Sequence, residues 1–182
     1  MTDDVHEAGN DAADIRAAIR DIANFPKPGV LFKDITPVLA DAALFRRATE
    51  LMAAPFRNAG VTLVAAIESR GFLFAAPVAL SLGVGLLPIR KPGKLPSRTE
   101  RLDYALEYGR DALEIHADAC DATARVLIVD DVLATGGTAR AACELVERLG
   151  ARVVGCSFLL ELSFLAGGKA LGERKRASVI SY

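Results

Sequence analysis

The stretch from Arg125 to Ala142 reads RVLIVDDVLATGGTARAA, and its pattern decides the fold class. The apolar run Arg125–Val129 predicts a buried strand, which is followed at once by two acids, Asp130 and Asp131. A short glycine-containing turn then leads into Gly137–Leu149, whose apolar residues recur at helical spacing. A strand that passes through such a turn into a helix is typical of α/β proteins with a parallel sheet.

The rest of the chain repeats this alternation of apolar strands and amphipathic helices. Asp41 is expected to cap a helix that runs toward Asn58, with a break at Pro55. Further helices are expected at Asp14–Ala23 and Gly71–Leu82. The other expected strands are Val61–Ile67, Val84–Arg90, Leu102–Tyr108, Asp111–His116, Arg152–Leu160 and Ser178–Tyr182. This order predicts an α/β fold with a mainly parallel central sheet flanked by helices.

Length and composition set limits on the kind of protein. The 182 residues, 52% of them hydrophobic and 25% charged, predict one globular domain over residues 1–182, with residues 1–10 disordered. The formal net charge of -1 argues against nucleic acid or an anionic membrane as a partner. Acids at Asp3, Asp4 and Glu7 are unlike a signal peptide, so we expect a cytoplasmic protein.

The turn after the Arg125–Val129 strand has the features of a phosphate site. Gly136 and Gly137 allow successive N–H groups to point inward and form an anion nest, and the helix N-terminus adds partial positive charge. Thr135 and Thr138 add hydroxyl donors. The lysine and the spacing of a Walker loop are missing, so a nucleoside triphosphate loop of that type is not predicted.

Two acids beside a phosphate nest indicate that the ligand carries hydroxyl groups. The carboxylates of Asp130 and Asp131 would repel a bare phosphate, but they can accept hydrogen bonds from the vicinal hydroxyls of a ribose. Acids and nest together therefore predict a sugar phosphate. The alternative from the residues alone is a loop whose acids cap the helix and whose glycines only form the turn.

The segment VDDVLATGGT, Val129–Thr138, resembles the phosphoribosyl pyrophosphate (PRPP) motif of the type I phosphoribosyltransferases. The stretches FPKPGVLFKDITPVL, ESRGFLFAAPVAL, LPIRKPGKLP and LEYGRDALEIHADA extend the resemblance from Phe25 to Leu162 and match the adenine-specific branch of that family. The resemblance implies the type I fold with a flexible hood loop. It also implies a purine-salvage transferase that joins the 5-phosphoribosyl group of PRPP to adenine, giving AMP and pyrophosphate.

The resemblance assigns a role to each matching residue. PRPP and AMP binding falls to Asp130, Asp131, Ala134, Thr135, Gly136, Gly137 and Thr138. Pyrophosphate binding falls to Glu68, Ser69, Arg70, Arg90, Lys91 and Lys94, with a cis peptide expected at Glu68–Ser69. Catalysis falls to Glu107, Arg70 and Lys91, and Tyr108 belongs to the hood loop. From the residues alone, an ordinary surface arginine is the favoured interpretation of Arg70, and a solvated loop is the alternative for the basic cluster.

Base recognition is expected in the proline-rich segment near residue 30. Adenine offers an acceptor at N1 and a donor at N6, which neighbouring main-chain N–H and C=O groups can match. The resemblance points to the main chain of Leu31 and Lys33, with Phe32 stacking on the ring. Phe25 and Leu162 complete the predicted base site. Simple core packing remains the alternative for Phe32 and Leu162.

A cofactor and a partner are also implied. Mg²⁺ is expected to bind mainly through the PRPP and pyrophosphate oxygens, so a site made by protein ligands alone is not predicted. A basic residue near Lys91 can cross a subunit interface in similar enzymes, which implies a homodimer. Two other functions stay open: transfer to hypoxanthine, guanine or xanthine, and a regulator that binds PRPP without catalysis.

Overall fold

A computed structural model of the protein describes residues 12–105 and 110–182. The chain divides into two compact units, Met1–Leu51 and Met52–Tyr182. Glu107 and Tyr108, which the resemblance places in the catalytic machinery and the hood loop, lie outside the described residues. No helix within the described ranges has the length and apolar character that crossing a membrane requires.

The first unit contains a short antiparallel hairpin and small helices. Residues 12–18 are helical. β1 (Arg20–Ala23) then pairs antiparallel with β2 (Leu31–Asp34). α2 (Thr36–Ala40) follows, and α3 (Ala42–Ala53) begins at Asp41, whose Oδ1 accepts hydrogen bonds from the N–H groups of Ala43 and Leu44 at 2.8 and 3.0 Å.

The prediction of a helix over Asp14–Ala23 is therefore wrong in its second half. The helix stops at residue 18 because the following residues pair with a strand eight or more positions later in the chain. Two cross-strand ion pairs support that pairing, Arg20 with Asp34 at 2.5 Å and Lys33 with Asp21 at 2.6 Å. Local helical spacing cannot reveal a partner that lies in another segment.

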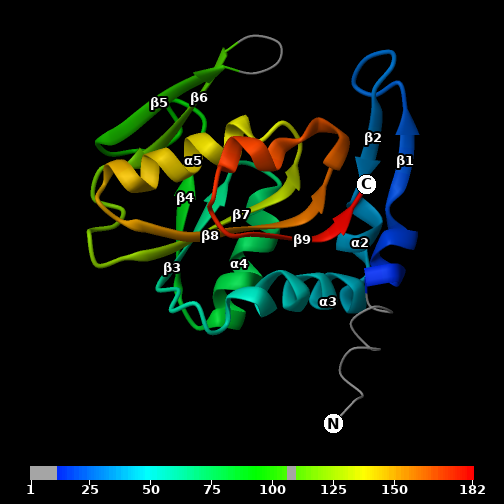
Figure 1. Ribbon diagram of the computed structural model, residues 1–182, viewed down its shortest axis with the longest axis horizontal. Coiled ribbons are helices and arrows are strands. Elements are labelled where there is room, and N and C mark those ends of the chain that lie inside the picture. The colour runs from blue at the N-terminus through cyan, green and yellow to red at the C-terminus, as the bar shows by residue number, and fades with distance from the viewer. Residues whose placement is uncertain (1–11, 106–109) are drawn as a thin grey trace. The chain divides into compact units, whose positions relative to one another are not determined.

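The second unit is built on a five-stranded, fully parallel sheet (Figure 1). Its order is β4-β3-β7-β8-β9. The strands are β3 (Leu63–Ile67), β4 (Gly85–Ile89), β7 (Arg125–Leu133), β8 (Arg152–Glu161) and β9 (Arg176–Ser181). Apolar side chains from the centre of this sheet are fully buried, as expected for parallel strands covered on both faces. The predicted last strand is confirmed, although it begins two residues earlier.

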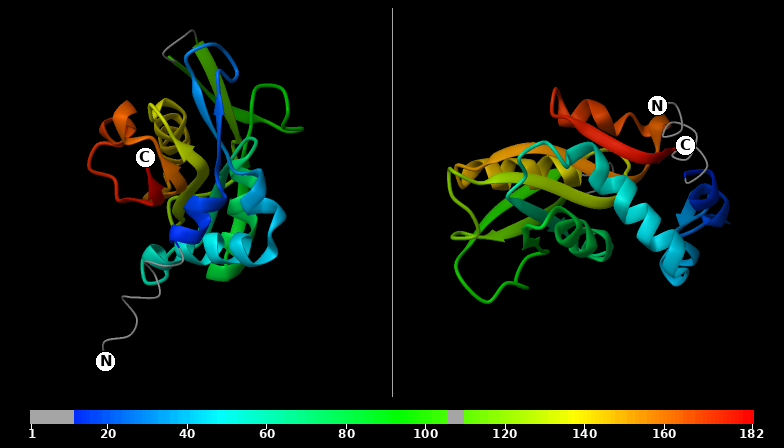
Figure 2. Two further views of the ribbon diagram at one scale, coloured as in Figure 1. Left: turned by 90° about the vertical axis from the view of Figure 1, so that its right-hand side faces the viewer. Right: turned by 90° about the horizontal axis from the view of Figure 1, so that it is seen from below.

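Helices and a second hairpin pack on this sheet. α4 (Gly71–Leu82) packs on β3, β7 and β4, and Gly83 ends it in the left-handed conformation. α5 (Gly137–Arg148) packs on β7 and β8, and the antiparallel hairpin of β5 (Thr99–Ala105) and β6 (Arg110–His116) lies against it, as Figures 1 and 2 show.

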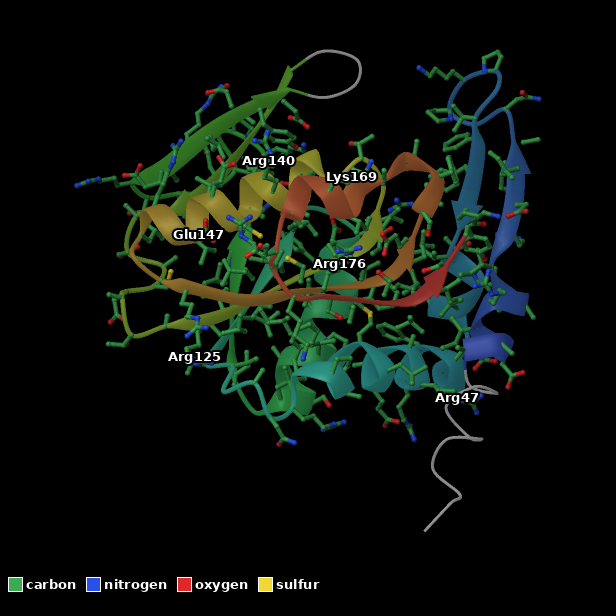
Figure 3. All side chains as sticks on the ribbon, in the orientation of Figure 1. Arg47, Arg125, Arg140, Glu147, Lys169 and Arg176 are labelled. Carbon is green, nitrogen blue, oxygen red and sulfur yellow. The ribbon has the colours of Figure 1, made fainter. Side chains whose placement is uncertain are left out.

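Three short 3₁₀ helices complete the unit: η1 (Ala54–Phe56), η2 (Ser163–Leu165) and η3 (Gly167–Leu171). η1 contains Pro55, where a break in the preceding helix was predicted. Arg140 and Glu147 are exposed on α5, and Lys169 is exposed on η3 (Figure 3). The buried faces of these elements therefore point to the sheet and their charges to solvent.

Candidate active site

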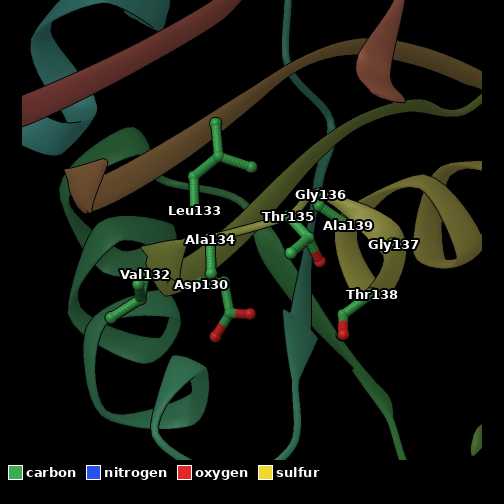
Figure 4. A pocket seen from close by; sticks show the side chains of 9 residues that line it. All are labelled: Asp130, Val132, Leu133, Ala134, Thr135, Gly136, Gly137, Thr138 and Ala139. Atoms are coloured by element: carbon green, nitrogen blue, oxygen red, sulfur yellow. The ribbon is translucent and has the colours of Figure 1, made fainter. Parts of the chain in front are cut away.

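The turn between β7 and α5 lies where the anion nest was predicted. Gly136 precedes the helix with a φ of 82°, a left-handed conformation that glycine adopts without strain. No side chain in the described part of the chain caps the first turn of α5, so its N–H groups are open to a ligand. A small cavity of about 70 Å³ is lined by Asp130, Val132, Leu133, Ala134, Thr135, Gly136, Gly137, Thr138 and Ala139 (Figure 4).

In Figure 4 the oxygen-bearing side chains of Asp130, Thr135 and Thr138 lie on one side of this turn, and Leu133 points to the other. The strand itself is longer than predicted. β7 continues past the acids to Leu133 because Asp130 and Val132 still pair with β8. A regular, paired strand therefore holds both acids in place, where a loop was expected.

A second, larger pocket of about 300 Å³ joins the ends of three strands. Its lining consists of Glu68, Ser69, Arg70, Lys91, Asp130, Asp131, Val132, Ala134 and Thr138. Residues 68–70 follow β3, Lys91 follows β4, and the remainder belong to β7, the turn after it and the first turn of α5. Ligands of parallel sheets bind at this carboxyl edge. This pocket therefore brings together some of the predicted phosphate and pyrophosphate residues. Thr135, Gly136 and Gly137 line the smaller cavity, and Arg90 and Lys94 line neither.

The two acids have different surroundings. The Asp131 side chain is only 6% exposed, and its Oδ2 lies 2.8 Å from Arg70 Nε. Burial raises the pKa of Asp131, against the opposing charge of Arg70. Burial and the charge of Asp131 together raise the pKa of Asp130 well above its usual range. The buried surroundings therefore disfavour two negative charges on this pair. A ligand that donates hydroxyl hydrogen bonds to the carboxylates, or a bound cation, would stabilise their charged form.

Gly71 explains why this turn follows β3 so tightly. A Cβ at Gly71 would lie 2.7 Å from Asp130 Oδ1 and 3.1 Å from the Val129 carbonyl oxygen. Only glycine allows the start of α4 to approach the acids this closely. The peptide bond between Glu68 and Ser69 is cis, as predicted.

Glu68 organises the basic cluster. Its Oε2 accepts hydrogen bonds from Arg90 Nε at 3.0 Å and from the Lys91 N–H at 2.9 Å, and Lys94 Nζ contacts its other oxygen. Burial alone would raise the pKa of Glu68, but these hydrogen bonds lower it to about 2. In this structure the carboxylate thus holds the cations that were predicted to bind pyrophosphate.

Lys91 belongs to a network that the sequence did not predict. Its Nζ pairs with Asp111 Oδ2, and the Tyr104 hydroxyl lies 3.2 Å from the same carboxylate oxygen. The Tyr104 hydroxyl is also 3.3 Å from the Thr138 hydroxyl. Burial opposes the change, but the Asp111 hydrogen bond raises the pKa of Lys91. Tyr104 and Asp111 are directly opposite each other on β5 and β6, so only the strand register could have revealed them.

The predicted base segment forms the tip of the β1–β2 hairpin in the first unit. Phe25 and Leu31 are 50% and 51% exposed, and the rings of Phe25 and Phe32 stand edge-to-face with centroids 5.0 Å apart. The main-chain groups of Leu31 and Lys33 share one edge of β2 because they are two residues apart. The Lys33 ammonium pairs with Asp21.

Leu162 lies in the second unit, at the start of η2. Its N–H donates to the Leu133 carbonyl at 2.9 Å, and its side chain is half-buried. This hydrogen bond fixes the main chain of Leu162 to the end of β7, next to the turn that leads into α5. It does not belong to the fully buried core.

The pocket also suits a magnesium ion that arrives on a ligand. Within residues 12–105 and 110–182 no cluster of three or more His, Cys, Asp or Glu could hold a metal. Asp130 and Asp131 nevertheless line the larger pocket, and burial raises the pKa of both. Carboxylate oxygens of this kind, together with substrate phosphates, are what Mg²⁺ prefers.

Comparison with known proteins agrees with this geometry. The family described as Phosphoribosyl transferase domain matches residues 35–180. An adenine phosphoribosyltransferase of Myxococcus xanthus (strain DK1622) is 54% identical over 170 residues, which cover 93% of this chain and 92% of that protein.

Two solved structures extend the comparison. Adenine phosphoribosyltransferase from Thermoanaerobacter pseudethanolicus superposes with a TM-score of 0.92 at 51% identity, covering 94% of this chain and 99% of that one. The Saccharomyces cerevisiae enzyme, complexed with D-2,5-dideoxy-2,5-imino-altritol 1,6-bisphosphate and adenine, has a TM-score of 0.88 at 38% identity, with coverage of 94% and 99%. This chain belongs to the adenine phosphoribosyltransferase family of type I phosphoribosyltransferases.

Proposed function

We propose that this chain transfers the 5-phosphoribosyl group of PRPP to adenine, forming AMP and pyrophosphate in purine salvage. The observation that carries the proposal is the single pocket at the ends of β3, β4 and β7. It brings the paired acids, two residues of the β7–α5 turn and the basic side chains of Arg70 and Lys91 together, a set that can accept the ribose hydroxyls and balance the phosphate charges of PRPP. The yeast relative solved with adenine supports the choice of base.

At the sugar end, the turn Ala134–Thr138 holds the 5-phosphate through main-chain N–H groups and the hydroxyls of Thr135 and Thr138. Asp130 and Asp131 accept hydrogen bonds from the ribose hydroxyls. Fixing the sugar at both points aligns its C1 with the incoming base and contributes to rate through orientation.

At the pyrophosphate end, Ser69 offers a hydroxyl, and Arg70 and Lys91 offer positive charge to the leaving group. Arg90 and Lys94 form ion pairs with Glu68 and add to the positive charge near the leaving group. Mg²⁺, bound mainly through the oxygens of PRPP, would neutralise further negative charge on the pyrophosphate. The C1–O bond to pyrophosphate then breaks as positive charge develops on the ribose ring.

The base completes the reaction from the opposite face. Its nitrogen forms a bond to C1 with inversion, and the proton on that nitrogen leaves. We assign this proton handling to Glu107, and the exclusion of water to the hood loop that contains Tyr108. The main chain of Leu31 and Lys33 reads the adenine edge, Phe32 stacks on the ring, and Phe25 and Leu162 supply apolar contacts.

We also propose a cytoplasmic homodimer. The exposed side chains of α4 are all apolar: Leu73, Ala76 and Leu80 are exposed, and Pro77 beside them is half-buried. These residues share one face because they are three, four and seven positions apart. β4 is an edge strand beside this helix, and its Leu86 is 44% exposed. Exposed apolar side chains of this kind favour association with a second copy.

The function is tested by incubating the protein with PRPP, Mg²⁺ and one purine base at a time. Adenine should give AMP and pyrophosphate, and hypoxanthine, guanine and xanthine should be at least about a hundredfold slower, because their ring edge reverses the donor and acceptor pattern. Preference for a 6-oxopurine would replace adenine in the proposal. PRPP binding without pyrophosphate release for any base would favour the regulator.

The sugar assignment is tested by changing both acids. The double variant Asp130→Asn with Asp131→Asn should lower kcat/KM for PRPP by about a hundredfold or more, because it removes charged acceptors from the ribose hydroxyls. Circular dichroism checks that the fold is kept. Asp118→Asn, an exposed residue that follows β6, is the control and should leave turnover unchanged. Near-normal PRPP turnover in the double variant would refute the ribose assignment.

A further inference from the structure

The backbone of η3 packs directly against the backbone of the turn at Ala134–Thr138, which we proposed to bind the 5-phosphate. Gly167 is buried, and a Cβ added to it would lie 2.1 Å from the Ala134 carbonyl oxygen and 3.0 Å from the Gly136 nitrogen. Both neighbours are backbone atoms of the turn, so neither can move aside as a flexible side chain would. Any residue larger than glycine at 167 must therefore displace the turn or η3.

The contact is reciprocal. A Cβ at Gly136 would lie 2.3 Å from the Gly167 carbonyl oxygen and 2.8 Å from Ala170 Cβ. Each glycine thus presents its Cα hydrogen toward a carbonyl oxygen of the other segment, a close approach that weak Cα–H···O contacts stabilise. Two segments about thirty residues apart in sequence are thereby fitted together at two glycines.

This fit sets the direction of one peptide group in the nest. The Cβ position of Gly167 is 2.1 Å from the Ala134 oxygen but 3.0 Å from the carbon of the same carbonyl, so the oxygen points at Gly167. In a trans peptide the next N–H points the opposite way. The Thr135 N–H is therefore directed away from η3. Thr135 itself lines the small cavity shared by Asp130 and residues 132–139.

We propose that Gly167 is a positioning residue for sugar-phosphate binding: by accepting the Ala134 carbonyl against its Cα, it aims the Thr135 N–H at the 5-phosphate. The inference rests on the proposed function, in which this turn binds the phosphate of PRPP. Gly167 itself touches no substrate. Its effect is to hold the nest in the bound shape before the ligand arrives, which lowers the ordering cost of binding.

The test compares Gly167→Ala with Gly168→Ala by calorimetry. Gly168 is the matched control because it is the next residue, is also buried and lies in the same 3₁₀ helix. Its Cβ would meet the Arg176 guanidinium at 2.5 Å, the far end of an exposed side chain that can move. The probes are ribose 5-phosphate, which needs the nest, and pyrophosphate with Mg²⁺, which uses the Ser69–Arg70 turn.

Gly167→Ala should weaken ribose 5-phosphate binding by about tenfold to a hundredfold and change pyrophosphate binding by less than about twofold. Gly168→Ala should leave both affinities within about twofold of the wild-type protein. Unchanged ribose 5-phosphate binding by Gly167→Ala overturns the inference, and so does an equal loss for both probes or for both variants.

If Gly167→Ala does not fold, the same binding measurements are made on Ala170→Val. Ala170 Cβ lies 2.8 Å from the Cβ position of Gly136, so added methyl groups on Ala170 should crowd this contact and shift η3 from the turn. A selective loss of ribose 5-phosphate affinity supports the inference, and unchanged affinity overturns it. Failure of the wild-type protein to bind ribose 5-phosphate would instead refute the proposed function itself, so the two failures are distinguishable.

Discussion

At the scale of single residues, the site depends on side chains that hold other side chains. Glu68 was predicted to lie at the pyrophosphate, and the structure shows its carboxylate bound by Arg90, the Lys91 N–H and Lys94. Asp111 and Tyr104 do the same for Lys91. Arg90, Lys91 and Lys94 are thus held in place by acids, and the hydrogen bonds from these cations lower the pKa of Glu68 to about 2.

Stability should depend on pH through Glu68. Its folded-state pKa of about 2 lies below the ordinary value of 4.5, so its contribution is present above about pH 4.5 and is lost as pH falls toward 2. Glu68→Gln should therefore reduce the free energy of unfolding by about 2 kcal/mol at neutral pH, and the difference should shrink below about pH 4.

Urea unfolding of the wild-type protein and Glu68→Gln, from neutral pH to about pH 3, measures this difference. Asp118→Asn, exposed and outside the pocket, controls for the loss of one charge. A difference that stays constant over the whole range would show that the Glu68 carboxylate is not held by its cations.

At the scale of elements, β8 shows how one glycine positions a central strand. Its register against β7 shifts between Val126, opposite Val153, and Leu127, opposite Gly155, so one residue of β8 is extra at this bulge. A Cβ at Gly155 would lie 2.4 Å from Phe56 Cε1 and 2.9 Å from the Lys175 carbonyl oxygen. The bulge and the fully buried Phe56 ring therefore require glycine here.

Gly155→Ala should destabilise the protein by about 1–3 kcal/mol, because the added methyl overpacks a rigid site. The control is Gly85→Ala in the edge strand β4, where the new Cβ meets only Leu63 Cδ2 at 3.0 Å, and its cost should stay below about 1 kcal/mol. Denaturant unfolding compares the two. Equal costs would mean that the loss of glycine itself, and not the contact with Phe56, determines the effect.

At the scale of the whole molecule, the proposed homodimer rests on apolar side chains of α4 that remain exposed in the folded chain. Leu80 and Leu73 are 81% and 46% exposed on one face of α4. In an amphipathic surface helix such positions are normally polar. A second copy that covers this face would remove apolar area from water and contribute to association in proportion to that area.

Leu80→Glu should therefore shift the protein from dimer to monomer and weaken association at least about tenfold, because a charge buried without a partner is costly. Sedimentation over a range of concentrations measures the change. Phe164→Glu is the control, since Phe164 is 73% exposed but lies on η2. A wild-type monomer, or a dimer that survives Leu80→Glu, would contradict the proposed interface.

Much of the fold could be predicted from local patterns. The bounds of α4 were predicted correctly at both ends because Gly83 and the apolar spacing are local signals. The strand at residues 20–23 was missed because its partner lies at residues 31–34. Likewise, β7 was predicted four residues too short, because its end is set by pairing with β8 and not by its own apolar run.

The sequence by itself determined the α/β order of elements, the glycine turn at Gly136 and Gly137, and the family, because these depend on neighbouring residues and their spacing. Only the tertiary structure decided what the functional groups touch. It pairs Arg70 with Asp131 and Lys91 with Asp111, and it packs Gly167 against the backbone of the turn between β7 and α5. Such contacts join segments far apart in the chain, and they exist only once strand order and register have brought those segments together.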